Sequence, residues 1–171
     1  MRCLLAGVLL TGMAWAQAGD NPQLTSSKAF FQMAKTNVLK SADKMPEDKF
    51  GFRPSDDVRT YGQILAHIAD AQYTLCGMVR EGKPVRKGIE KSATTKADIV
   101  KALNEAFAYC DAAYAGLTDA GSAATVSWFG QQRTKLTVLD FNITHTYEHY
   151  GNLVTYMRIN HIVPPSSEPK K

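Results

Sequence analysis

The chain has 171 residues, with 20 Lys and Arg against 16 Asp and Glu, for a formal net charge of +4. This length suits a single domain that can bury a sizeable hydrophobic core. The basic residues are scattered singly apart from Lys170 and Lys171, so no basic stripe would follow a phosphate backbone, and we expect no nucleic-acid binding.

The first 18 residues are predicted to be a secretory signal peptide. Arg2 gives a short positive region, and residues 4–15 form an apolar stretch too short to span a bilayer. Small residues stand at the −3 and −1 positions of two cleavage sites, after Ala16 and after Ala18. A lasting membrane anchor is the alternative, although anchors usually have more apolar length. We therefore expect an exported protein, periplasmic or secreted, with no stable membrane insertion after cleavage.

Next along the chain, Ser26 or Ser27 can cap a first helix that runs to about Lys44 and ends before Pro46. The apolar residues near one stripe of this helix are Phe30, Ala34, Val38 and Met45. After a long connection, Thr60 and Gln63 form a capping box for a second helix. This helix reaches about Arg80, and its expected inward face carries Ile64, His67, Ile68, Ala71 and Leu75.

A third helix is predicted from Thr95 to Gly116, followed by a short hairpin of residues 125–128 and 131–136. Thr137 is expected to open the longest helix.

That last helix is expected to end near His161. Long helices with connections of mixed length predict an all-α fold, a four-helix bundle with a long crossover and a short β-hairpin before the last helix. The bundle is expected to occupy residues 24–165, followed by a polar tail at 166–171.

The two cysteines that follow the signal segment, Cys76 and Cys110, fall inside the second and third predicted helices. In an oxidising compartment this even pair can form a disulfide if the two Cα atoms come within about 7 Å. The alternative is two small buried hydrophobic residues. Neither cysteine has an obvious basic partner, so a catalytic thiolate is not expected.

His145 and His149 are four residues apart on the last predicted helix. Residues at this spacing share one helical face, roughly 6 Å apart along the axis. Two neutral imidazoles placed in this way can bind one divalent ion at about 2.0–2.1 Å from each nitrogen. On spacing alone, two surface histidines are an equally good interpretation. A third histidine, His67, lies on the second predicted helix.

Several short motifs occur in an order that resembles the DinB-like superfamily of metal-binding four-helix bundles. These motifs are Met45-Pro46-Glu47, Arg53-Pro54, Leu65-Ala66-His67, His145 to Leu153 (HTYEHYGNL), Tyr156-Met157-Arg158 and Pro164-Pro165. The resemblance covers about residues 30–165 and implies a three-histidine metal site formed by His67, His145 and His149.

Two residues depart from the family pattern. Asn152 stands where glutamine is usual, and this shorter amide keeps one donor group and one acceptor. His161 stands where a glycine commonly closes the helix, and we interpret it as a turn residue or C-terminal charge rather than a ligand.

Three neutral nitrogens leave a coordination position open for water or substrate, as in catalytic sites. Zinc is the first choice of metal, with nickel or iron as alternatives, because imidazole suits all three. Because the ligands must be neutral, metal binding is expected to weaken as the pH falls through about 6.5. No side chain is a clear general base: Glu148 is expected on the surface, and Asp70 either orients His67 or is solvated.

The resemblance implies a metal-dependent hydrolase or transferase of a small molecule, including a thiol S-transferase. The alternative is a non-catalytic metal-binding or structural protein of the cell envelope. An enzyme requires an accessible, partly apolar pocket over the metal, whereas a structural site would be closed by a fourth side chain. A homodimer is left open.

Overall fold

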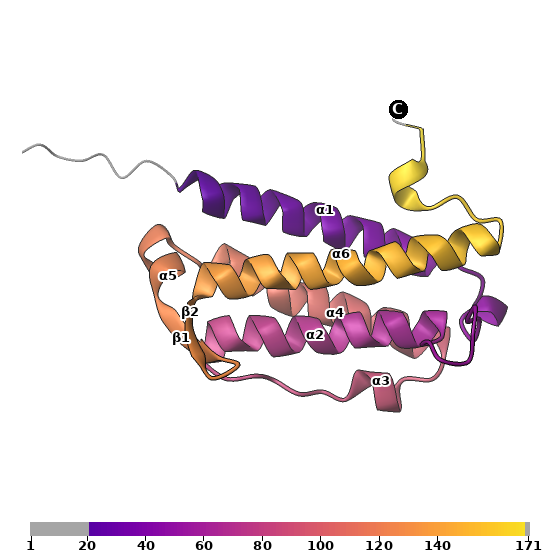
Figure 1. Cartoon of the computed structure of the whole chain (residues 1–171), viewed down its shortest axis with the longest axis horizontal. Helices are drawn as coiled ribbons and strands as arrows, with labels where there is room; N and C mark the ends of the chain where they lie inside the picture. The colour runs from indigo at the N-terminus through magenta and orange to yellow at the C-terminus, as the bar shows by residue number, and fades with distance from the viewer. Residues whose placement is uncertain (1–20, 170–171) are drawn as a thin grey trace, which may run out of the picture.

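The computed structural model describes residues 21–169, so the predicted signal peptide lies outside the described residues. Four long helices form a bundle: α1 (Pro22–Lys44), α2 (Tyr61–Glu81), α4 (Lys96–Ala115) and α6 (Lys135–Ile159) (Figure 1). The smaller elements are two short helices, α3 (Ile89–Ser92) and α5 (Asp119–Ala123), two 3₁₀ turns (Glu47–Lys49 and Pro165–Ser167), and the strands β1 (Thr125–Trp128) and β2 (Gln131–Thr134). The predicted fold class is confirmed.

The order of the helices explains the long crossover. Helix α2 packs against α4 and α6, and α1 packs against the same two helices, so α1 and α2 occupy opposite corners. Helices α1 and α6 run in one direction and α2 and α4 in the other (Figure 1). Because α2 and α4 are parallel, the connection between them runs back along the bundle, and it carries α3 on the way.

The helix boundaries follow local capping. Helix α1 begins earlier than predicted, because the Asn21 side chain accepts the backbone N–H groups of Gln23 and Leu24 and Pro22 occupies the first turn. In α2 the predicted capping box is present, with Thr60 and Gln63 each bonding the other's backbone N–H.

Both ends of α6 differ slightly from the prediction. Thr134, rather than Thr137, caps the helix: its hydroxyl accepts the Thr137 backbone N–H at 3.1 Å. At the other end His161 has a positive φ of 59°. The Ile162 N–H donates to the Met157 carbonyl at 2.9 Å, which is a helix-closing bond of the Schellman type. His161 therefore serves as the turn residue that the sequence suggested.

The buried face of α1 contains Phe31 instead of the predicted Phe30. Phe31 is 1% exposed and stacks on Tyr114 with ring centroids 4.1 Å apart, whereas Phe30 is 53% exposed. One residue rotates a helix position by about 100°, so choosing Phe30 over Phe31 moved the expected contact to the surface. Ala34 and Val38 are fully buried, as predicted.

A buried polar cluster joins α2 to α6. The Gln72 amide donates to the Thr146 hydroxyl at 2.9 Å and accepts from the Asn142 amide at 2.9 Å. All three side chains are buried, so each needs its partner in a defined place. The cluster fixes the axial register of α2 against α6, the two helices that carry the three histidines.

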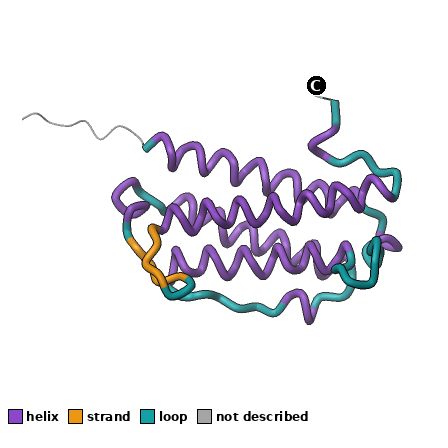
Figure 2. Tube along the Cα trace, viewed as in Figure 1, coloured by secondary structure: helices purple, strands orange, loops and turns teal. Residues whose placement is uncertain are grey.

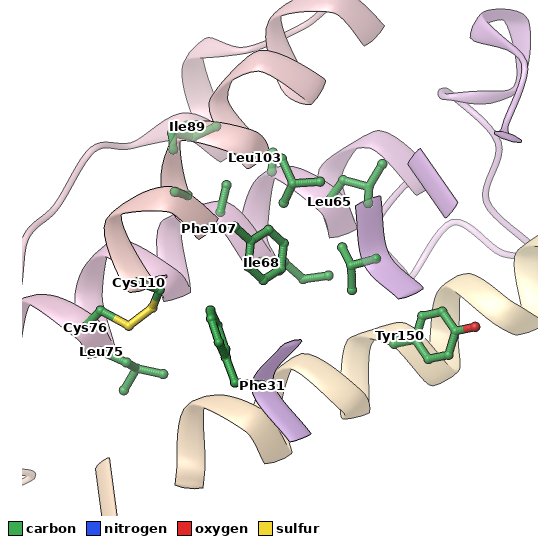
Figure 3. Close-up of a cluster of buried hydrophobic side chains, with 14 of the residues drawn as sticks. Phe31, Leu65, Ile68, Leu75, Cys76, Ile89, Leu103, Phe107, Cys110 and Tyr150 are labelled. Carbon is green, nitrogen blue, oxygen red and sulfur yellow. A yellow bond between two sulfur atoms is a disulfide. The ribbon is translucent and has the colours of Figure 1, made fainter. Parts of the chain in front are cut away.

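A disulfide joins α2 to α4. Cys76 and Cys110 are bonded within the buried cluster, with Cα atoms 5.4 Å apart (Figure 3). Of the two alternatives left open by the sequence, the disulfide is the one found in the structure.

The hairpin lies at the end of the bundle where α2 ends and α6 begins (Figure 2). Its strands pair antiparallel, with Trp128 opposite Gln131. Within the described part of the chain, every helix is too short or too polar to cross a bilayer.

Candidate metal centre

Three histidines from two helices meet between α2 and α6. One ring nitrogen of each of His67, His145 and His149 lies within 4.8 Å of the others. The Nε2 atoms of His145 and His149 are 3.1 Å apart. Two ligands held at about 2.1 Å from one ion are roughly 3.0–3.4 Å apart, so this pair already has a suitable separation. The structure thus brings together all three histidines selected from the sequence.

Burial keeps two of these rings neutral. Desolvation, reinforced by the neighbouring histidines, lowers the pKa of His145 to about 4. Burial also lowers the pKa of His149, with the charge of His67 adding to the effect. Neutral imidazoles are the form that binds metals. The expected loss of metal binding near pH 6.5 is therefore shifted to lower pH for these two ligands.

Glu90 orients His67. Its Oε2 atom lies 3.0 Å from His67 Nδ1, and its Oε1 atom accepts a hydrogen bond from Arg59 Nε at 2.7 Å. Burial alone would raise the pKa of the Glu90 carboxyl, but the hydrogen bonds from Arg59 and His67 outweigh it and lower the pKa. An ionised carboxylate can only accept, so His67 Nδ1 carries a proton, and in the neutral ring Nε2 is the nitrogen that keeps its lone pair.

Asp70 supports this arrangement indirectly. Its two carboxylate oxygens accept the backbone N–H groups of Ile89 and Glu90, both at 2.9 Å. Asp70 therefore anchors the start of α3, and α3 presents Glu90 to His67. One interpretation of the sequence was that Asp70 orients His67. In the structure Glu90 makes that contact, and Asp70 bonds the backbone of α3.

The centre opens on two sides. A polar cavity of about 740 Å³ lies beside His149 and is also lined by Arg59, Glu90 and Asn152. A second cavity of about 550 Å³ is lined by His67 and His145 together with aromatic side chains of the hairpin and α6. Among residues 21–169 the donor cluster consists of the three histidines, without a fourth His, Cys, Asp or Glu. The arrangement has room for an exogenous molecule.

The sequence model of the DinB superfamily matches residues 31–153. The chain belongs to the DinB superfamily.

Solved structures agree with the fold of this DinB protein. A DinB-like protein from Bacillus subtilis (YjoA) superimposes with a TM-score of 0.69 at 18% identity, covering 85% of this chain and 99% of that one. The mycothiol-dependent maleylpyruvate isomerase gives a TM-score of 0.63 at 14% identity, and a histidine-to-alanine mutant of it gives 0.66 at 13%. Both comparisons cover 76% of this chain, which spans 60% of the isomerase chain. None of the curated proteins compared with the chain matches it.

Two residues of the DinB motifs, Glu148 and Tyr156, lie on the same helix as His145 and His149. Glu148 is exposed, as expected. The Tyr156 hydroxyl donates to the Arg59 carbonyl at 2.9 Å and so holds the loop that positions the Arg59 side chain. Arg59 and Glu90 were missed by sequence reasoning, because Glu90 reaches His67 only when the crossover is folded and Arg59 contacts Glu90 rather than His67.

Proposed function

We propose that this DinB protein binds one divalent metal through His67, His145 and His149 and uses it to transform a small molecule. The observation that carries the proposal is the meeting of three ring nitrogens within 4.8 Å beside two cavities. The depressed pKa values of His145 and His149 keep these two rings neutral, and Glu90 holds His67 through Nδ1 so that Nε2 is the nitrogen left for a metal cation.

Zinc is the proposed metal, with nickel and iron as the alternatives that the same donor set accepts. A bound divalent ion would supply Lewis-acid activation of water or of a thiol. His67, His145 and His149 would hold the ion, Glu90 and Arg59 would keep His67 oriented, and the cavities would admit the reactant.

Hydrolysis or group transfer on a small molecule is the proposed reaction class. Thiol S-transfer is the second candidate, supported by the structural similarity to a mycothiol-dependent isomerase. A non-catalytic metal-binding protein of the cell envelope is the alternative to both.

We also propose that the protein is exported. The buried Cys76–Cys110 disulfide is of the kind that persists in oxidising compartments. Low-molecular-weight thiols are chiefly cytosolic, so export favours the hydrolase over the thiol transferase. Intact-mass measurement on exported material should give a chain that starts at Gln17 or Gly19, and retention of Met1 would contradict the proposal.

The direct test of function is metal analysis of protein purified without a histidine tag, followed by a survey of ester, amide and thiol-transfer substrates. One metal per chain with turnover that is lost in His145→Ala supports the enzyme. One metal per chain without turnover supports the binding protein, and absence of stoichiometric metal contradicts both.

A further inference from the structure

The hairpin and α6 together place a ladder of aromatic rings beside the three histidines. The rings of Phe129 and Trp128 are tilted by 36° with centroids 4.8 Å apart, and the Trp128 centroid lies 4.7 Å from that of Phe141. Phe141 in turn lies 6.1 Å from the His145 ring. The ladder therefore leads from the exposed tip of the hairpin to one of the histidines at the metal centre.

Phe129, at the tip of this ladder, has an unfavourable exposure and an unfavourable backbone conformation. Phe129 is 84% exposed and has a φ of 47°, and the following Gly130 has a φ of 72°. A two-residue hairpin turn with two positive φ angles favours Asn-Gly over a bulky aromatic residue at the first position. Both the exposure and the backbone conformation of Phe129 reduce the stability of the free protein. A ligand that contacts the ring would explain why a phenylalanine stands at this position.

The rings form one wall of the 550 Å³ cavity, a size that suits a small ligand. Leu75 and Met78 of α2 also line the cavity, together with His67 and His145 of the candidate metal centre. The cavity is thus apolar along most of its surface, with a reactive end at the histidines.

The cavity also has one free cationic group. Arg86, on the crossover, lines it and is exposed, and no described carboxylate lies within ion-pair distance of Arg86. The other charged residue in the wall, Asp70, is already engaged by the backbone N–H groups of Ile89 and Glu90. Arg86 is therefore the charged side chain of the wall whose N–H donors are available to a ligand.

We infer that this cavity binds a small molecule with a planar apolar body and an acidic group. The body lies on the Trp128–Phe129–Phe141 wall, and the acidic group pairs with Arg86. This inference specifies the substrate class of the proposed function and rests on it for the chemistry at the histidines, but the binding itself depends only on the cavity.

The test is calorimetric titration of the whole chain, stripped of metal with a chelator so that no probe can bind through an ion. The probes are 2-naphthoate, neutral 2-naphthalenemethanol of the same shape, and acetate, which has the charge without the ring. We expect 2-naphthoate to bind about two- to fivefold more tightly than the alcohol, since an ion pair with an exposed arginine contributes roughly that factor, and acetate not to bind.

Variants assign the two contacts. Arg86→Gln should reduce the affinity for 2-naphthoate to that for the alcohol. Phe129→Ala should weaken the binding of both aromatic probes. Matched controls are Arg133→Gln on the same hairpin and Phe30→Ala, an exposed phenylalanine on α1; neither residue lines the cavity, and neither change should alter binding. Unchanged 2-naphthoate affinity in both Arg86→Gln and Phe129→Ala, or no binding to the unmodified chain, would overturn the inference.

The same titrations separate this inference from the metal site. His149 does not line the cavity, so metal-free His149→Ala should still bind 2-naphthoate with the Arg86 dependence. Retained probe binding without metal binding in the unmodified chain would refute the proposed function alone. Metal binding without probe binding would refute the cavity inference alone.

Discussion

The Asp70 carboxylate accepts the backbone N–H of Glu90 at 2.9 Å, and the Glu90 carboxylate lies 3.0 Å from Nδ1 of His67. Asp70 and His67 are on the same helix, about one turn apart. Helix α2 therefore holds Glu90 through Asp70, and Glu90 in turn orients His67 of the same helix. The candidate metal centre is consequently built from three parts of the chain, α2, α3 and α6.

Removing the Glu90 carboxylate should weaken metal binding while the fold persists. Glu90→Ala leaves His67 without its acceptor, and loss of such a partner typically lowers metal affinity about 10- to 100-fold. Glu90→Gln keeps an acceptor oxygen but loses the charge, so its effect should be smaller. Metal titration followed by calorimetry measures both. Glu105→Gln, an exposed glutamate on α4, is the control, and equal affinities for all four proteins would show that Glu90 does not position His67.

Acid should destabilise the metal-free protein in a defined window. The pKa of His145 in the folded state is about 4, below the unfolded value near 6.5, so the unfolded chain binds more protons between these limits. The free energy of unfolding therefore falls as the pH is lowered from about 6.5. The lowered pKa of Glu90 acts mainly below its ordinary value of 4.5, so the range from pH 6.5 to 5 reports on His145 and His149.

Urea unfolding with a chelator present, at pH 6.5 and 5, measures this effect. His145→Ala should reduce the pH dependence. A pH dependence that is the same in His145→Ala and in the unmodified chain would argue against a depressed pKa at this site.

The disulfide should stabilise the bundle without contributing to metal binding. It closes a segment of 34 residues, for which the chain-entropy estimate is about 3–4 kcal/mol. Replacing both Cys76 and Cys110 by Ala should lower the melting temperature by roughly 10 °C, as measured by calorimetry. Metal stoichiometry should stay at that of the unmodified chain, and an unchanged melting temperature would show that the bond adds no stability.

Alanine substitutions at two glycines should change the free energy of unfolding in opposite directions. At Gly77 an added Cβ would lie 2.8 Å from Val85 Cγ2 and 2.9 Å from Val85 N, so Gly77→Ala pushes the crossover away from α2. Overpacking of this kind costs about 1–3 kcal/mol. At Gly151 on α6 an added Cβ meets nothing within 4 Å, so Gly151→Ala should stabilise by up to about 1 kcal/mol. Urea denaturation checks both signs, and stabilisation by Gly77→Ala would refute the close approach.

The sequence predicted what local periodicity and spacing encode. The capping box at Thr60 placed α2, and the four-residue spacing of His145 and His149 placed both rings on one face. The third histidine, His67, was added by family resemblance, because the spacing of two residues on α6 says nothing about which residue on α2 faces them.

Features that depend on tertiary contacts were not predictable in this way. Helix α3 has only four residues, and its start is held by Asp70 from another helix, so no local signal marks it. Glu90 therefore could not be recognised as the partner of His67. The choice of Phe30 over Phe31 in α1 failed for a related reason: both are apolar neighbours, and only packing against Tyr114 distinguishes them.

Anomalous X-ray diffraction at the zinc absorption edge, on crystals of tag-free protein grown with zinc, tests the central claim most directly. We predict one strong peak within bonding distance of one nitrogen each from His67, His145 and His149, and no such peak in the His145→Ala variant. A chain with ordered histidines and no peak between them, or a peak that survives in the triple alanine variant, would contradict the proposed metal centre.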